Sequence, residues 1–231
     1  MHQFVRIGGS SEAAQFPADK DILYGVGMHF IAAVIIIVIS LLNFTGCTQR
    51  PKESLVIEAM DTVCTVTLFD DATHAIYDEI TECIRYNDAL FSISNPQSDT
   101  CRVNSSAGIK PEKVSQEFLH VLKVGMTVAS LTDGAFDPCA GALIDLWNIN
   151  GGSENFVVPS EEEVKRAGIQ GLSDWTKITM EDDAVFLPYK GMKINLGAIA
   201  KGWVCDCVVQ VLRKNNVRRA VIDLGGNVYV Y

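Results

Sequence analysis

The chain has 231 residues, 48% of them hydrophobic, which is enough to bury the core of one domain or of two small ones. It carries 28 acidic and 19 basic residues, a formal net charge of −9. This acidic balance argues against a nucleic-acid-binding surface, so basic side chains matter only where they stand at particular places.

An export signal is predicted at the amino terminus. Residues 30–42 are almost all aliphatic, and the run is followed closely by Gly46 and Cys47. It is shorter than the roughly 20 apolar residues of a membrane-spanning helix, but it suits the apolar region of a signal peptide. The ending resembles a bacterial lipobox, which implies cleavage before Cys47 and a diacylglycerol on its sulfur. An uncleaved signal anchor is the alternative, and Met28 is a second candidate start.

The predicted organisation follows from this cleavage site. Residues 1–46 are the signal peptide, residues 47–54 a polar tether and residues 55–231 the folded domain. We therefore expect an exported protein, anchored by lipid to the periplasmic or extracellular face of a bacterial cell membrane.

The other six cysteines lack the regular spacing of a disulfide scaffold. Most are expected to be small core residues, with Cys83 and Cys207 on apolar helix faces. Cys205 and Cys207 are two residues apart on a predicted helix, so they point to different faces and are poorly placed to share a metal ion.

Helices and strands are mixed along the domain. A strand region is predicted over residues 55–69, and a helix follows that starts at 70–73 and ends near Phe91. Residues 101–108 form a loop or a short helix, and a second long helix runs over about 116–131. Near the end of the chain, residues 220–231 read as a strand, a glycine turn and a second strand.

A defined loop follows the second long helix. Glycine and proline break a helix, so the sequence Gly134-Ala-Phe-Asp-Pro holds Phe136 and Asp137 in fixed relation. Phe136 offers a flat apolar face to a ring, whereas Asp137, directly before proline, is also the pattern of a helix cap.

Residues 195–202 read Asn-Leu-Gly-Ala-Ile-Ala-Lys-Gly and lead into an amphipathic helix. The first backbone N–H groups of a helix lack intrahelical partners and lie at the positive end of its dipole, so they favour a phosphate, and Lys201 adds a full charge. Glycines that merely punctuate the chain, with a solvated lysine, are the alternative reading. The buried face of the helix is predicted at residues 199, 203, 204, 207, 208, 211 and 212.

Four segments in this order resemble the ApbE family, the FAD:protein FMN transferases. They are Met60-Asp-Thr; Leu90-Phe-Ser-Ile-Ser with Ser98-Asp-Thr-Cys-Arg-Val-Asn; Asp133-Gly-Ala-Phe-Asp-Pro with Gly141-Ala-Leu-Ile-Asp-Leu-Trp; and the segment at 195–202 with Leu224-Gly-Gly-Asn. The resemblance implies an α+β fold, a mixed α/β arrangement of antiparallel sheets with packed helices. A doubly wound dinucleotide fold is disfavoured because Gly-x-Gly-x-x-Gly is absent.

The resemblance also implies an enzyme that transfers FMN from FAD to a threonine or serine hydroxyl of an acceptor flavoprotein, with Mg²⁺, releasing AMP. The acceptor would be, for example, a subunit of an ion-pumping redox complex. The implied FAD contacts are Met60, Ser94, Ala135, Phe136, Asp137, Asn195 and Lys201, and the carbonyl of Ala198 would contribute to the magnesium site. Two positions depart from the family: Ser94 stands in place of a tyrosine, and Asn195 in place of the commoner aspartate.

The sequence stops at Tyr231, where family members continue. The resemblance implies that the catalytic residues and the remaining magnesium ligands belong to the later part, so the domain over 55–231 is expected to be incomplete for catalysis. A lipid-anchored module that binds FAD without transferring FMN is the alternative. A structural lipoprotein that binds no flavin is a third reading.

Overall fold

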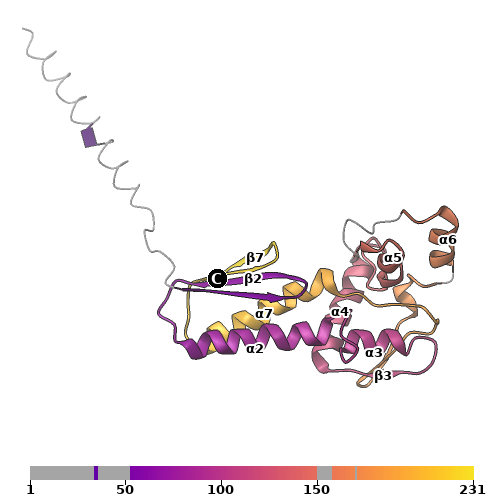
Figure 1. Ribbon diagram of the computed structural model, residues 1–231, viewed down its shortest axis with the longest axis horizontal. Coiled ribbons are helices and arrows are strands. Elements are labelled where there is room, and N and C mark those ends of the chain that lie inside the picture. Colours follow the sequence, from indigo (N-terminus) through magenta and orange to yellow (C-terminus); the bar gives the residue numbers. More distant parts are fainter. Residues whose placement is uncertain (1–33, 36–52, 150–157, 170) are drawn as a thin grey trace, which may run out of the picture. The chain divides into compact units, whose positions relative to one another are not determined.

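The computed structural model describes residues 34–35, 53–149, 158–169 and 171–231 (Figure 1). The chain divides into two compact units, residues 1–49 and 50–231. In the first unit only Val34 and Ile35 are described, and both are exposed. The predicted cleavage site, Cys47 and most of the tether lie outside the described residues. Within the described ranges, no helix has the length and apolar character needed to cross a membrane.

Four antiparallel strands form the larger sheet of the second unit, in the order β1-β2-β6-β7. They are β1 (Glu53–Ala59), β2 (Thr62–Leu68), β6 (Ala220–Leu224) and β7 (Asn227–Val230). The strand region predicted over 55–69 is thus a hairpin, because Met60 and Asp61 both have φ 56°, the positive pair of a two-residue turn that matches strand twist. The strand–turn–strand prediction for 220–231 is confirmed, with Gly225 at φ 65° in its turn.

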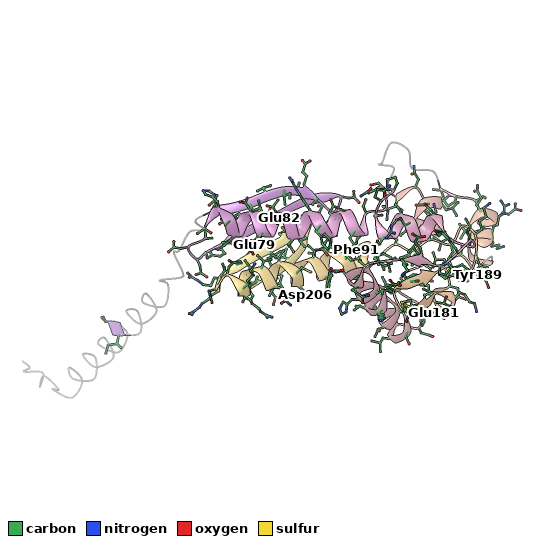
Figure 2. All side chains as sticks on the ribbon, turned by 90° about the horizontal axis from the view of Figure 1, so that it is seen from below. Glu79, Glu82, Phe91, Glu181, Tyr189 and Asp206 are labelled. Atoms are coloured by element: carbon green, nitrogen blue, oxygen red, sulfur yellow. The ribbon has the colours of Figure 1, made fainter. Side chains whose placement is uncertain are left out.

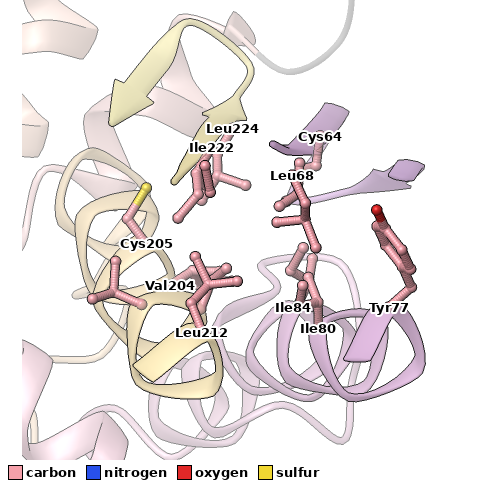
Figure 3. Packing of buried hydrophobic residues seen from close by; sticks show 14 of the residues in the cluster. Cys64, Leu68, Tyr77, Ile80, Ile84, Val204, Cys205, Leu212, Ile222 and Leu224 are labelled. Atoms are coloured by element: carbon pink, nitrogen blue, oxygen red, sulfur yellow. The ribbon is translucent and has the colours of Figure 1, made fainter. Parts of the chain in front are cut away.

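Helices α2 (His74–Phe91) and α7 (Gly197–Lys214) pack against this sheet. The packing encloses a first hydrophobic cluster, shown in Figure 3. Its fully buried side chains come from the strands and from both helices: Cys64, Val66, Leu68, Ile80, Ile84, Val204, Val208, Leu212, Ile222 and Leu224. Apolar residues at helical spacing meet apolar residues that alternate along the strands, which is the usual origin of a two-layer core.

The buried face of α7 is rotated from the predicted one. Cys205 and Val209 are buried, whereas Trp203 and Cys207 are only half-buried. The side toward β7 is closed, since Asn227 Nδ2 lies 3.8 Å from Cys205 Sγ. The side that carries Trp203 and Cys207 instead faces α2, along a groove that stays open to solvent.

A second cluster surrounds α4 (Gln116–Leu131) and a three-stranded antiparallel sheet of order β3-β5-β4. The elements are α3 (Asp99–Ser105), β3 (Glu112–Lys113), α5 (Gly141–Leu146), α6 (Glu161–Ile169), a short 3₁₀ helix (Trp175–Lys177), β4 (Thr179–Glu181) and β5 (Ala184–Phe186). The rings of Phe91 and Phe118 stack with centroids 6.1 Å apart. Met60 and Trp203 pack against both clusters.

The predicted α+β class, with antiparallel sheets and packed helices, is confirmed, as are the long helices that end at Phe91 and span 116–131. The start of α2 differs from the prediction. Asp70 lies four residues before the helix and accepts hydrogen bonds from the backbone of Arg218 and Arg219 and from the Arg219 guanidinium. These bonds, that of Arg218 first, hold the pKa of Asp70 below its usual value. Asp70 therefore ties this segment to the start of β6.

Candidate functional site

The site is organised around the short extended segment that enters α7. Asn104 of α3 grips this segment at Ile194: its Nδ2 donates to the Ile194 carbonyl (2.9 Å), and its Oδ1 accepts from the Ile194 N–H (2.7 Å). Ile194 itself is 1% exposed, so its backbone has no other ready source of partners. Asn104 thereby fixes the position of the next residue, Asn195.

The loop after α4 holds the same segment from another side. The Asn195 N–H donates to the Pro138 carbonyl (2.9 Å), and the Gly141 N–H donates to the Lys193 carbonyl (3.1 Å). Residues from three of the sequence motifs therefore meet here, Asn104 through its side-chain amide and the loop after α4 through its backbone.

Gly141 is required by this close approach, which leads to a testable result. A Cβ at position 141 would lie 2.7 Å from the Lys193 carbonyl oxygen and 3.0 Å from its carbon. We expect Gly141→Ala to lower the free energy of unfolding by about 1–3 kcal/mol, the usual cost of overpacking. Urea denaturation measures it. Gly202→Ala is the matched control, because Gly202 is helical with nothing within 4 Å of the added carbon, and we expect a gain of about 0.5–1 kcal/mol. An equal response of the two variants would contradict the packing argument.

The Asn195 side chain satisfies a backbone N–H group at the start of helix α7. Its Oδ1 accepts from the Gly197 N–H (2.9 Å), whereas Leu196, the residue at the cap position, has no side-chain oxygen to offer. The Asn195 amide group donates to none of the described residues, so its N–H groups are available to a ligand.

A cavity of about 220 Å³ opens beside this first turn. It lies between the β1–β2 turn, the carboxyl end of α2 and the start of α7. Its lining is Met60, Asp61, Asp88, Phe91, Ser92, Ile93, Asn195, Gly197, Ala200 and Lys201. The structure thus brings together three of the predicted contacts, Met60, Asn195 and Lys201. Lys201 makes no hydrogen bond or ion pair within the described part of the chain.

Two carboxylates share this cavity with the single lysine. Asp88 Oδ1 accepts from the Met60 N–H (2.9 Å), which holds the hairpin turn against α2, and Asp61 is exposed in that turn. An anionic ligand is therefore favoured on the α7 side, near Lys201, and disfavoured beside the carboxylates. Burial raises the pKa of the nearby Cys64 thiol, with the Asp88 charge adding to this and the Lys201 charge opposing it.

A second cavity of about 260 Å³ adjoins the first. The two share Ile93 and Asn195, so these residues stand where the cavities meet. The rest of the second lining is Cys101, Asn104, Ser105, Gly141, Asp145, Lys193 and Ile194, with Lys193 ion-paired to Asp145. Together the two cavities form one polar cleft, and they meet at Ile93 and Asn195.

The remaining predicted contacts lie outside both linings. Ser94 is exposed, with its hydroxyl 3.2 Å from that of Ser92, and its neighbour Ile93 lines both cavities instead. Ala135 is exposed and Phe136 is half-buried, with its N–H donating to Thr132 Oγ1 (3.1 Å). This loop reaches the site only through its backbone.

Asp137 does not cap a helix. Its Oδ1 accepts from the Cys139 N–H (2.7 Å), which closes a local turn before α5, and the cap position of α5 is Ala140. The helix-cap reading was therefore wrong, because the turn that proline imposes ends before the helix begins.

The Asp137 carboxyl also gives a pH-dependent prediction. Burial raises its pKa, the Asp174 charge adds to this, and the backbone N–H groups of Cys139 and Trp175 oppose it. A raised pKa means that the ionised form costs stability at neutral pH and that this cost disappears below the ordinary range of aspartate, about pH 4. We expect Asp137→Asn, which keeps the acceptor oxygen, to be more stable than the parent at pH 7 and equal to it at low pH. Urea unfolding at both pH values tests this, and a less stable variant at pH 7 would refute it.

The described residues do not form a magnesium site. Among them, no group of three or more His, Cys, Asp or Glu side chains is placed to hold a metal ion. Ala198, exposed in the first turn of α7, offers only its carbonyl oxygen. Mg²⁺ needs near-octahedral oxygen ligation, usually with carboxylates.

Most residues that line the two cavities were not predicted as contacts, among them Asp88, Ile93 and Asn104. Asn104 carried a signal, since it is the last residue of the segment Ser98-Asp-Thr-Cys-Arg-Val-Asn, which resembles a family motif. Asp88 and Ile93 are brought to the cavity by the packing of α2 against α7, which no local pattern reveals.

Fold and site together define an α+β protein with helix-covered antiparallel sheets and a polar cleft at the start of α7. The model of the ApbE family matches residues 60–231, and the chain belongs to this family. It is 29% identical over 179 residues to an FAD:protein FMN transferase of Treponema pallidum, covering 73% of this chain and 48% of the relative. It is 31% identical over 157 residues to one of Klebsiella pneumoniae, covering 67% and 48%. The chain therefore spans about half the length of these relatives.

Solved structures agree with the fold. The ApbE protein of Thermotoga maritima superposes with a TM-score of 0.68 at 29% identity, covering 77% of this chain and 58% of that one. The flavin transferase ApbE of Vibrio cholerae superposes with a TM-score of 0.69 at 23% identity, covering 77% and 59%. At that lower identity the likeness concerns the fold alone.

Proposed function

We propose that FAD binds across the two cavities that meet at Asn195, and that the protein transfers FMN from FAD to a threonine or serine hydroxyl of an acceptor flavoprotein, releasing AMP. The names of the curated relatives support the class of reaction. The observation that carries the proposal is Lys201, which lines one of the two cavities near the start of α7 and has no partner among the described residues.

The chain's own residues would bind and orient the dinucleotide. Lys201, near the positive end of the α7 dipole, suits the pyrophosphate, which bears the charge of FAD. Asn195, at the junction, can donate to and accept from the polar edge of a base. Phe91 and Ile93 supply apolar surface to the same cavity. Two adjoining cavities suit a ligand with two ring systems joined by a charged link.

Magnesium is included in this proposal only because the resemblance to the ApbE family implies it. Bound beside the pyrophosphate, it would neutralise charge that develops during phosphoryl transfer. Ala198 would offer one carbonyl oxygen. The described residues do not fit the rest of its coordination, so no step of the reaction is assigned to it.

Location and partner are also part of the proposal. A lipid on Cys47 would hold the domain at the bacterial membrane, where exported acceptors such as subunits of ion-pumping redox complexes are found. Metabolic labelling with a radioactive fatty acid tests this, because label should enter the parent chain and be lost in Cys47→Ala.

Titration of the chain with FAD, followed by tryptophan fluorescence, tests the binding site. We expect saturable binding that ADP competes away, since both carry the pyrophosphate. No binding by a chain whose circular dichroism shows it folded would refute the site. Covalent flavin on an added acceptor, seen as fluorescence on a denaturing gel, tests the transfer. Binding without labelling would identify an FAD-binding module in place of the transferase.

A further inference from the structure

Helices α2 and α7 run antiparallel and are held in register along their length. Near one end, Trp203 Nε1 donates to Asn87 Oδ1 (2.8 Å). Near the other, Glu79 Oε2 accepts from Lys214 Nζ and from Asn215 Nδ2, both at 3.1 Å. Figure 2 labels Glu79 and Glu82 on α2 and Asp206 on the neighbouring α7. These contacts fix which residues of the two helices face each other.

Cys83 and Cys207 lie between these contacts. Cys83 is four residues from both Glu79 and Asn87, and Cys207 is four residues after Trp203, so all lie on the facing sides of the helices. The two thiols are near enough to influence the ionisation of one another. Both side chains are half-buried and line a groove of about 630 Å³ that is open to solvent. A small reagent can therefore reach them.

We infer that Cys83 and Cys207 form a reversible dithiol–disulfide site that joins α2 to α7. The other described cysteines are placed differently. Cys64, Cys139 and Cys205 are buried, and Cys101 directs its thiol to the Ser92 carbonyl (3.6 Å). Thiols that lie on the facing sides of two registered helices and line one groove are well placed to form a bond between the helices.

The two thiols have different roles in the oxidation. The neighbouring Cys207 lowers the pKa of Cys83, whereas the neighbouring Cys83 raises the pKa of Cys207. The Cys83 thiolate attacks one sulfur of a small-molecule disulfide, forms a mixed disulfide and releases one thiolate. Cys207 then loses its proton and attacks the Cys83 sulfur, which releases the second thiolate. Two protein thiols are oxidised to one disulfide, and the small disulfide is reduced to two thiols.

The Cys83–Cys207 disulfide would fix α2 and α7, which form two walls of the cavity proposed for FAD. Cys83 precedes Asp88 by five residues and Cys207 follows Lys201 by six, so the link lies roughly 8–9 Å along each helix from a cavity residue. The disulfide can form whether or not FAD binds.

Equilibration of the full chain with mixtures of reduced and oxidised glutathione, approached from both directions, tests this inference. After acid quenching and maleimide labelling, the intact mass should show two fewer adducts at the oxidising end. Digestion should yield one linked peptide that contains Cys83 and Cys207.

Two variants and a control sharpen the result. Cys83→Ser and Cys207→Ser should each abolish the loss of two thiols, and Cys207→Ser should leave a glutathione adduct on Cys83. Cys101→Ser, at another half-buried thiol, should behave as the parent. Full labelling of both cysteines in a folded chain equilibrated with excess oxidised glutathione would overturn the inference, as would a linked peptide that joins other cysteines.

Discussion

Lys201→Met should weaken FAD binding by about 10- to 100-fold, since a hydrogen bond to a charged group contributes about 1.5–3 kcal/mol and each 1.4 kcal/mol is tenfold in affinity. The reason is local: Lys201 is the only lysine or arginine in the lining of its cavity and has no other partner among the described residues. Methionine keeps the length of the stem and its helix propensity, so the fold should be unaffected. Isothermal titration of FAD gives the affinity directly.

Lys214→Met is the control for this variant. Lys214 is on the same helix, at its other end, and pairs with Glu79 outside the two adjoining cavities. We expect its FAD affinity to match that of the parent. The effect of Lys201→Met should also shrink at high salt, because screening weakens the attraction that the parent still has. Equal affinities of both variants and the parent would remove Lys201 from the site.

Asn104→Ala should lower the free energy of unfolding by about 3 kcal/mol, because it leaves the N–H and C=O of a buried residue without partners, at about 1–3 kcal/mol each. That residue is Ile194, and the two lost bonds are 2.7 and 2.9 Å long. FAD affinity should fall as well, since Asn195 follows directly and stands at the junction of the cavities. Urea unfolding and the FAD titration measure the two effects.

Ser105→Ala serves as the comparison for Asn104. Ser105 is exposed on the same short helix, and its loss should change the unfolding free energy by less than about 0.5 kcal/mol. If Asn104→Ala proved as mild as this control, the bridge to Ile194 would not be what holds the segment that enters α7.

Local patterns predicted the long elements well. The helix over 116–131 has apolar residues at helical spacing and a serine that caps it, with Ser115 Oγ accepting from the Phe118 N–H (3.1 Å), so its limits follow from the sequence. The hairpin turn at Met60 and Asp61 was missed because neither residue is glycine, although aspartate tolerates positive φ. The true buried face of α7 depends on where β7 lies, which is tertiary information.

The candidate site was also predictable only where its residues are close together in the sequence. Asn195 and Lys201 belong to one continuous motif, whose helix start the sequence predicts, and the structure places both in one cavity. Met60 reaches that cavity from far along the chain, through a backbone hydrogen bond to Asp88. That pairing arises when two distant elements pack, so only the resemblance to a family could suggest it. The positions of Ser94 and Phe136 as flavin contacts stay predictions.

Helix α7 crosses from one hydrophobic core to the other within four residues, since Ala200 belongs to the second cluster and Val204 to the first. Either core can open only if the part of α7 that belongs to it loosens. Because both parts lie on one continuous helix, the opening free energies of the two cores are linked. A ligand that holds the first turn would slow amide hydrogen exchange in both cores, including amides far from any atom that it touches.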